Sequence, residues 1–435
     1  MSVDLVIKNA RYLVTVDASN RILENATLVI DRGVITEINP ARVPDARQLF
    51  DASEHLVMPG LINTHSHLAM SLLRGWAEGV NLEGFLKKVW VAEGAIMDRE
   101  TCALGTELAA GESLHAGVTT VLDMYFHPDA THEAAVRVGL RHVAGPIFFD
   151  FPAVDGLAWK ARIDFARSWP DKLREIGGPE VPFFLMPHST YTDSPEHLAE
   201  VAQLAKELGS RIHLHVSETQ AENQDVIDRY GKSPTALLKE LGVLDVPTVF
   251  GHGVHLSDHD VMLVAQAGAA VAHCPGSNFK LGSGIADIRR YQDQGIAVGL
   301  GTDGCSSSND LDLWPVLRVA AHLIALNHGP EQVDLASLVR ASTIDGARAL
   351  GLNERIGSLE IGKDADLIAV DLKALHLTPI HNVLALLVYA VGRGDVSDVF
   401  VAGEQVVDSR RLTQVDVVDL QRRVARRIAA LERLR

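Results

Sequence analysis

Residues 58–67 read MPGLINTHSH, a mostly apolar run that ends in two histidines separated by one residue. Side chains at positions i and i+2 of a β-strand point to the same face, so a strand here would aim His65 and His67 at one point. Two imidazole nitrogens that converge in this way suit a transition metal. The stretch therefore predicts a buried strand whose carboxyl end carries part of a metal site.

Four later segments also end in, or open on, residues that bind metals or move protons. They are HVSE at residues 215–218, GHG at 251–253, the loop opening at residue 273, and GTDG at 301–304. A catalytic zinc needs three or four nitrogen or oxygen ligands and one open position for water. His215 and Asp303 complete such a set with His65 and His67. We predict one Zn²⁺ per subunit, although Fe²⁺, Mn²⁺ or cobalt also tolerates these ligands.

Three residues near these ligands are candidates for catalysis. Bound zinc lowers the pKa of its water from ~16 to about 7, which supplies a nucleophile at neutral pH. Glu218 follows His215 by three residues and is placed to carry a proton to the substrate. His252 can stabilise the attacking oxygen, and Asp303 can accept a hydrogen bond from the same water. We therefore predict a hydrolytic site.

Strand-like and helix-like stretches alternate through the centre of the chain. The strand-like runs span residues 56–63, 118–124, 142–149, 181–187, 211–216, 248–251, 269–273 and 296–301, and helical stretches include 99–115, 195–208 and 233–241. Eight such alternations predict an α/β fold of the (β/α)₈ TIM-barrel type, whose active site lies at the carboxyl ends of the strands. The proposed ligands follow the first, fifth and eighth runs, and His252 follows the sixth.

Both ends of the chain have a different pattern, with short β-rich runs separated by turn signals. We expect residues 1–57 and 358–410 to build one small β-sandwich domain, into which the barrel of residues 58–357 is inserted. The final segment, 411–435, contains an amphipathic, arginine-rich helix. Its apolar residues keep helical spacing, which favours a surface helix packed on the barrel or on another subunit over a basic interaction tail.

The amino-acid composition limits the kinds of partner that we expect the protein to bind. The formal net charge of −16 opposes binding to phosphate backbones and favours a neutral or cationic small-molecule substrate, so we expect no nucleic-acid partner. No run approaches the roughly 18 apolar residues of a membrane span, and no signal peptide is visible, so we expect no membrane partner. Three cysteines fit a reducing cytoplasm. Closed symmetry is usual in soluble enzymes and predicts a homo-oligomer.

The motifs above, with HCPGSNFKLGSG at residues 273–284 and IGSLEIGKDADL at 356–367, resemble those of the amidohydrolase superfamily, in its deaminase and chlorohydrolase branch. The resemblance implies one metal on His65, His67, His215 and Asp303, with Glu218 and His252 in proton transfer. Binuclear members of the superfamily carry a carboxylated lysine on the fourth strand. Residues 181–187 contain no lysine, which favours a mononuclear centre.

Within that branch, the chain most resembles 5′-methylthioadenosine/S-adenosylhomocysteine deaminases. The matching pieces are LLRG at residues 72–75, DMYFH at 123–127 and PHSTY at 187–191. In that group a glutamate and a histidine hold the ribose hydroxyls, and the matching positions here are Glu93 and His188. His127, which follows the second strand, is a further candidate for contact with the substrate.

The predicted reaction is zinc-dependent hydrolytic deamination of an adenosine-type nucleoside. Members of the group that accept S-adenosylhomocysteine carry arginines after the third strand, whereas residues 144–149 here read AGPIFF. We therefore expect 5′-methylthioadenosine, adenosine or 5′-deoxyadenosine rather than S-adenosylhomocysteine. One alternative is a deaminase or chlorohydrolase of a bare aminated ring, such as a triazine or a guanine-like base. A second alternative is a non-catalytic scaffold with this fold.

Overall fold

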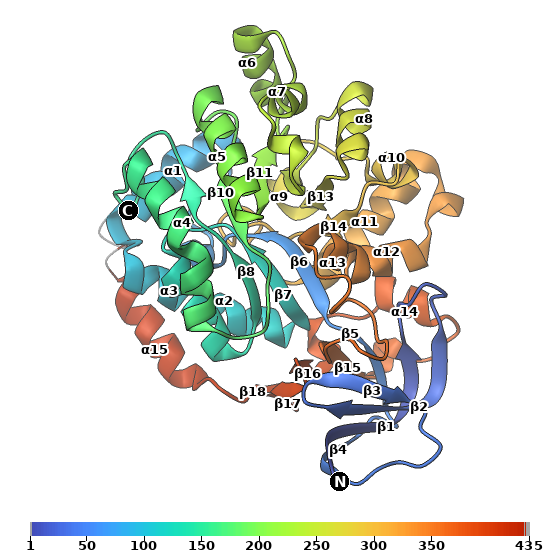
Figure 1. The fold of residues 1–435 in the computed structure, drawn as a ribbon. Coiled ribbons are helices and arrows are strands. Elements are labelled where there is room, and N and C mark those ends of the chain that lie inside the picture. The colour runs from blue at the N-terminus through green and yellow to red at the C-terminus, as the bar shows by residue number, and fades with distance from the viewer. Residues whose placement is uncertain (1, 430, 432–435) are drawn as a thin grey trace.

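The computed structural model describes residues 2–429 and 431, which form two nine-stranded sheets (Figure 1). One sheet is built from both ends of the chain and lies below the other in that view. Its strands are β1 (Val3–Val14), β2 (Ile22–Asp31), β3 (Val34–Ile38), β4 (Ala46–Asp51), β5 (His55–Pro59), β15 (Leu367–Asp371), β16 (Val396–Val401), β17 (Glu404–Asp408) and β18 (Arg411–Leu412). The two terminal segments join where β5 pairs antiparallel with β15.

The second sheet contains only parallel strands. They are β6 (Leu61–Ser66), β7 (Val118–Asp123), β8 (Arg141–Ala144), β9 (Ile147–Phe148), β10 (Phe184–Pro187), β11 (Arg211–Val216), β12 (Thr248–His252), β13 (Ala270–His273) and β14 (Val298–Leu300). The hydrogen-bonded order runs from β8 through β7, β6, β14, β13, β12, β11 and β10 to β9. Only Gly145 and Pro146 separate β8 from β9 in the chain. These two strands therefore act as one continuous strand of the barrel, and they close the ring of strands. The predicted (β/α)₈ barrel is confirmed.

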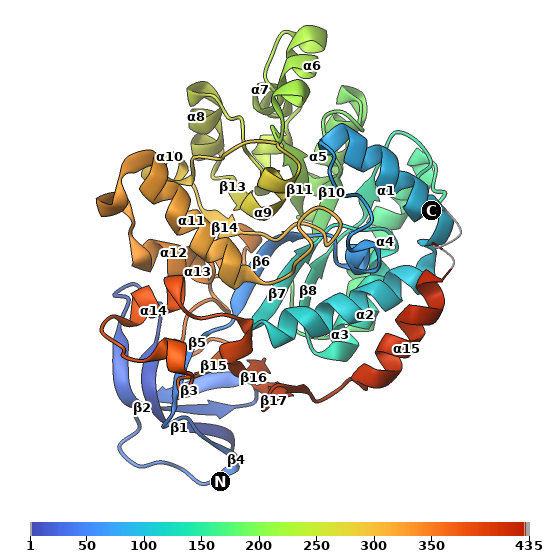
Figure 2. The ribbon, with the colours of Figure 1, turned by 180° about the vertical axis from the view of Figure 1, so that it is seen from behind.

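Helices cover the outside of the barrel, and Figures 1 and 2 show them from opposite sides. They are α1 (Leu82–Ile96), α2 (Arg99–His115), α3 (Pro128–Val138), α4 (Trp159–Ile176), α5 (Pro195–Leu208), α6 (Gln220–Tyr230), α7 (Pro234–Glu240), α8 (Asp258–Ala267), α9 (Pro275–Lys280), α10 (Ile288–Asp293), α11 (Leu313–His328), α12 (Leu335–Ala341), α13 (Ile344–Leu350), α14 (Val383–Tyr389) and α15 (Val417–Ile428). Among the described residues, no helix is long and apolar enough to cross a membrane.

The run at residues 56–63, predicted as one strand, is divided between the two sheets. β5 belongs to the terminal sheet and β6 to the barrel, and Gly60 separates them. A Cβ atom at Gly60 would lie 2.1 Å from Oγ1 of Thr119, so only glycine fits at this crossing. Both strands are buried and apolar, which is why the sequence pattern does not reveal the break.

The predicted C-terminal helix is shorter than the segment 411–435. It begins at Val417 and ends at Ile428, and residues 432–435 lie outside the described part of the chain. Figure 2 shows α15 beside α2. Its Arg423 pairs with Glu107 of α2 at 2.5 Å, and Arg427 pairs with Asp98 at the start of that helix. The arginine-rich face therefore packs on acidic residues of the barrel.

Arg141 connects the barrel to the terminal sheet. Its Nε donates to Asp366 at 2.8 Å and one Nη donates to Asp364 at 2.9 Å, although the arginine side chain is fully buried. Because an isolated buried charge is costly, the two carboxylates and the guanidinium depend on one another. This contact holds the two sheets in a fixed relation.

Candidate metal centre and active site

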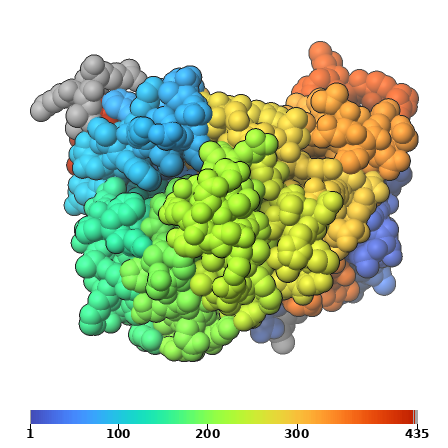
Figure 3. Space-filling view, turned by 90° about the horizontal axis from the view of Figure 1, so that it is seen from above, coloured from blue at the N-terminus to red at the C-terminus, as the bar shows by residue number. Residues whose placement is uncertain are grey.

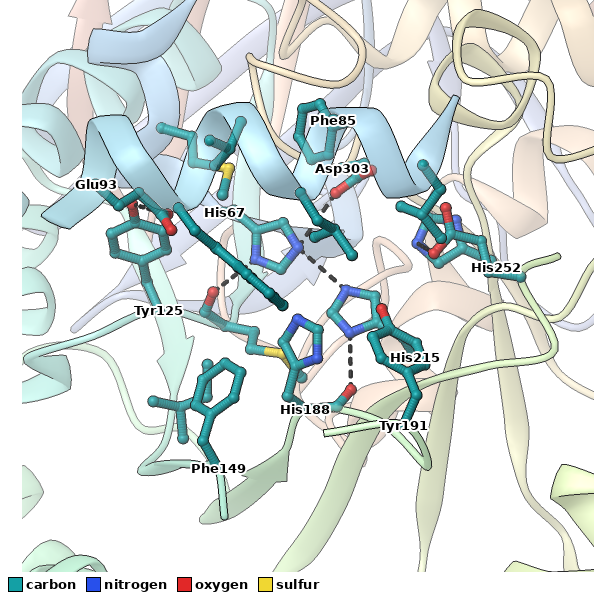
Figure 4. Close-up of a pocket in the computed structure, with 18 of the residues that line it drawn as sticks. His67, Phe85, Glu93, Tyr125, Phe149, His188, Tyr191, His215, His252 and Asp303 are labelled. Atoms are coloured by element: carbon teal, nitrogen blue, oxygen red, sulfur yellow. Dashed lines mark hydrogen bonds and ion pairs between the residues drawn. The ribbon is translucent and has the colours of Figure 1, made fainter. Parts of the chain in front are cut away.

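The four predicted metal ligands converge at the carboxyl end of the barrel. The Nε2 atoms of His65 and His67 lie 3.5 and 3.2 Å from Oδ1 of Asp303. The Nε2 atoms of His67 and His215 lie 3.2 Å apart. Figure 4 shows His67, His215 and Asp303 pointing toward one another in the pocket. Three nitrogens and one carboxylate oxygen at these separations are a set that fits a zinc ion.

Hydrogen bonds behind the ligands fix which ring nitrogen faces the centre. Nδ1 of His67 donates to the carbonyl of Met124 at 2.6 Å, and Nδ1 of His215 donates to the carbonyl of His188 at 2.8 Å. A histidine that donates through Nδ1 keeps a lone pair on Nε2 when it is neutral. Both rings therefore present Nε2 to the centre.

His65 is oriented by a second histidine that the sequence analysis missed. Nδ1 of His213 donates to the carbonyl of Val249 at 2.9 Å, so its Nε2 can only accept, and it accepts from Nδ1 of His65 at 2.7 Å. Nε2 of His65 is then buried without a partner, as expected of an atom that binds a metal. His213 stands two residues before His215 on β11, and this spacing on one strand face was the available signal.

Asp303 is held as an anion by several donors. Its Oδ1 accepts from the backbone of Gly304 and its Oδ2 from the hydroxyl of Ser307, both at 2.7 Å. Burial alone would raise the pKa of Asp303, but contact with the imidazoles of His65 and His67 holds it well below its usual range. Ser307 belongs to the serine-rich loop after Asp303, which therefore shapes this ligand directly.

The backbone is strained at three of these positions. Ser217, His252 and Asp303 have φ values of 52°, 69° and 61°, in the left-handed region that non-glycine residues rarely adopt. Each such residue costs on the order of 1–3 kcal/mol and persists only where its surroundings enforce it. All three follow or end strands β11, β12 and β14, so the strain gathers at the rim that carries the candidate site.

Glu218 and His252 lie side by side next to the ligands. The Nε2 atom of His252 is 3.8 Å from a carboxylate oxygen of Glu218, and its Nδ1 donates to the Asn278 side-chain oxygen at 2.9 Å. Ser283 donates to the other oxygen of Glu218 at 3.4 Å. Burial raises the pKa of Glu218, so the carboxyl group can hold a proton and pass it on.

A second buried glutamate, also missed from the sequence, fixes the position of Glu218. The carboxylate of Glu222 accepts from the backbone N–H groups of Ser217 at 3.1 Å and Glu218 at 2.8 Å. It also accepts from the hydroxyl of Thr190 at 3.2 Å. Burial raises the pKa of Glu222 to about 7. The strained turn after β11 is therefore tied to the first turn of α6.

A pocket above the metal ligands, called here the catalytic pocket, brings Glu93 and His188 to the same site. Its wall includes Phe85, Val89 and Trp90 from α1, with Ile147 and Phe149 from the opposite side. Tyr125 donates its hydroxyl hydrogen to Glu93 at 2.6 Å, and burial raises the pKa of Glu93 to about 7. Burial lowers the pKa of His188 to about 3, so this ring is neutral.

His127 is not part of the catalytic pocket, contrary to our expectation. It has a left-handed φ of 54° and directly precedes α3. The residue lines a separate cavity with Arg162, on the other side of Ile147. Arg162 is buried there and pairs through both Nη atoms with Asp155 at 2.8 Å.

Comparison with known proteins agrees with this geometry. A model of the amidohydrolase family matches residues 56–406. The 5-methylthioadenosine/S-adenosylhomocysteine deaminase of Moorella thermoacetica is 38% identical over 88% of this chain and 89% of that protein. The 5′-deoxyadenosine deaminase of Methanosarcina barkeri is 37% identical over 95% of each chain. A crystal structure of an adenosine deaminase from Xanthomonas campestris with bound zinc superimposes with a TM-score of 0.94, at 36% identity, over 98% of this chain and 99% of that one.

Proposed function

The chain belongs to the amidohydrolase family, and from this premise we propose that it is a zinc-dependent aminohydrolase that deaminates an adenosine-type nucleoside. The observation that carries the proposal is the meeting of three groups in one place. The lining of the catalytic pocket contains His67, His215 and Asp303 of the ligand set together with the Glu218–His252 and Glu93–His188 pairs, and His65 is fully buried beside them. The zinc in the similar adenosine deaminase supports the choice of metal.

The residues of the chain divide the chemistry among them. A bound zinc ion supplies a water acidic enough to lose a proton at neutral pH. Asp303 and His252 hold the attacking oxygen by hydrogen bonds as it approaches C6 of the purine. Glu218 carries one proton of the water to N1, the second proton passes from the new C6 hydroxyl to the amino group, and the C6–N bond breaks to release ammonia. The raised pKa of Glu218 suits this exchange, because the carboxyl group must both accept and give the proton.

The walls of the pocket favour a nucleoside with a small, uncharged 5′ group. We assign the ribose hydroxyls to Glu93 and His188, which line the pocket together with aromatic side chains. In the part of the chain that the structure describes, the pocket lining contains no lysine or arginine. Arg162, which follows residues 144–149 in the sequence, already forms an ion pair with Asp155. A carboxylate such as that of S-adenosylhomocysteine would therefore be buried without a cation, which is unfavourable.

Ammonia release from a panel of compounds tests the proposal. The zinc-loaded enzyme is given 5′-methylthioadenosine, adenosine, 5′-deoxyadenosine, S-adenosylhomocysteine, guanine, cytosine and aminotriazines. We expect turnover of the uncharged adenosines and little from S-adenosylhomocysteine. His188→Ala should then impair the nucleosides far more than any bare ring. Activity confined to bare rings would refute the ribose contacts and leave the metal chemistry in place.

Three further features belong to the same proposal. We infer one Zn²⁺ per subunit, because strand β10 offers no lysine that a second metal would need. The three cysteines are free and buried, which supports a reducing compartment such as the cytoplasm. A closed homo-oligomer is proposed on the usual symmetry of soluble enzymes. Metal content by elemental analysis and mass by light scattering test the first and third statements.

A further inference from the structure

A second cavity of about 640 Å³ lies next to the catalytic pocket. The two share the side chains of Leu82, Leu86, Tyr191 and Leu281, which therefore stand at the boundary between them. A volume of this size is in the range of small-molecule binding sites, roughly 300–1,000 Å³. The deamination proposed above does not require it, because ammonia is far smaller than the cavity.

The second cavity lies at the reactive end of the catalytic pocket. Figure 4 shows Glu93 and Tyr125 at one end of the pocket and His252 at the other, with Tyr191 nearer to His252. The partners of Glu218 lead to the same place. Ser283, whose hydroxyl donates to Glu218, and Glu222, which accepts from its N–H, both line the second cavity.

The position of the cavity determines which part of a bound nucleoside faces it. With the ribose at Glu93 and His188, the purine extends toward Glu218, which exchanges a proton with N1. The exocyclic nitrogen is bonded to C6, next to N1, and therefore lies on the same edge of the ring. A substituent on that nitrogen would pass between Leu82, Leu86 and Leu281, which are apolar, and enter the second cavity.

We propose that the enzyme also accepts adenosine-type nucleosides that carry an alkyl or benzyl group on the exocyclic nitrogen, and releases the corresponding amine. This inference rests on the proposed function. Water adds its oxygen to C6 while Glu218 carries one of its protons to N1; the second proton passes from the new C6 hydroxyl to the exocyclic nitrogen, the C6–N bond breaks, and the amine leaves. The other product is the same 6-oxo nucleoside as in simple deamination, and no oxidant or reductant is consumed.

The shared leucines and the second cavity suit different parts of such a substituent. The shared leucines give the first carbons of the substituent apolar contacts. Burial of this apolar surface is favourable by about 25 cal/mol per Å². Beyond them, Thr219 and Gln220 give the cavity a more polar wall. Ala221, in the first turn of α6, also lines the cavity and contributes only a methyl group.

Matched substrates and matched variants test the inference. The substrates are 5′-deoxyadenosine and its N6-methyl and N6-benzyl derivatives, and the products are ammonia, methylamine or benzylamine together with the 6-oxo nucleoside. Ala221→Trp places an indole ring in the second cavity, whereas Gln224→Trp places the same side chain on an exposed position of α6 outside it. Thermal melting establishes that both variants are folded.

We expect the wild-type enzyme to release all three amines. Ala221→Trp should lower kcat/KM for the N6-benzyl substrate by at least about tenfold, the least effect usual for a filled apolar subsite, and leave 5′-deoxyadenosine nearly unchanged. Gln224→Trp should change neither. Release of ammonia without any benzylamine or methylamine would overturn the inference while the proposed function stands, and so would equal effects of Ala221→Trp on all substrates. No turnover of any of the three would overturn both.

Discussion

Replacing His213 by leucine should weaken zinc binding without touching a metal ligand. In the native protein, His213 accepts a hydrogen bond of 2.7 Å from Nδ1 of His65 and donates one of 2.9 Å to Val249. This chain places the hydrogen of His65 on Nδ1 and the lone pair on Nε2, toward the metal. Leucine removes the acceptor, so the buried Nδ1–H loses its partner and the ring loses its fixed tautomer.

The expected loss of zinc affinity follows from other metal sites. Removing a hydrogen-bond partner of a metal ligand there lowers the metal affinity about 10- to 100-fold. That range corresponds to about 1.4–2.7 kcal/mol, since each tenfold step is worth about 1.4 kcal/mol. It is also the usual cost of leaving one buried polar group unpaired, about 1–3 kcal/mol. The two estimates agree because both describe the same N–H group of His65.

Competition between the protein and a chromophoric chelator measures the zinc dissociation constant. His213→Gln, whose amide oxygen can still accept from His65, should recover part of the affinity. His132→Leu is the matched control, because His132 is also buried but contacts none of the metal ligands. At saturating zinc, kcat of His213→Leu should approach that of the wild type. If a folded His213→Leu protein binds zinc as tightly as the wild type does, the orientation argument is wrong.

Four shorter predictions concern catalysis and stability. Glu218→Gln should reduce turnover by orders of magnitude while zinc stays bound, and near-normal ammonia release would refute its role. Removal of zinc by a chelator should abolish activity and lower the melting temperature, because the metal binds only the folded state. Arg141→Leu should destabilise the protein by about 3–5 kcal/mol in denaturant titrations, because the buried carboxylate of Asp366 loses its cation. Burial raises the pKa of Glu93 from 4.5 to about 7, so the folded protein keeps a proton that the unfolded chain loses, and stability falls as pH rises through this interval. The free energy of unfolding, measured at pH 5 and pH 8, should therefore decrease less in Glu93→Gln than in the wild type, by up to about 3 kcal/mol.

The barrel and the convergence of its candidate metal ligands could be predicted because they depend on local patterns. Parallel strands buried on both faces appear as short apolar runs, and residues at their carboxyl ends necessarily meet at one rim. The histidines on β6 and β11 are therefore brought together by the barrel itself. The break at Gly60 could not be predicted in the same way, since apolar residues continue across it and the reason for it is Thr119 of the neighbouring strand.

Residues that only position other residues of the candidate site were harder to predict from the sequence. Glu222 looks like an ordinary surface glutamate in the first turn of a helix, and its role depends on the strained turn at Ser217 that its carboxylate holds. The same reasoning applies to His127. It follows the second strand as an active-site residue would, but it lines the separate cavity that contains Arg162. The sequence alone does not show to which of two neighbouring cavities such a residue belongs.

The structure places metal chemistry and substrate choice on different elements. The ligands stand on barrel strands or directly after them, whereas Phe85, Trp90 and Glu93 come from α1, which crosses above the ligands in Figure 4. Viewed from above in Figure 3, the light-blue region of α1 borders the green and yellow segments of the barrel. Substitutions on α1 can therefore change the accepted 5′ group while the metal ligands stay in place. Phe85→Ala should accordingly alter KM among the adenosines and leave zinc affinity unchanged, and a loss of zinc from this variant would show that the two functions are not separable.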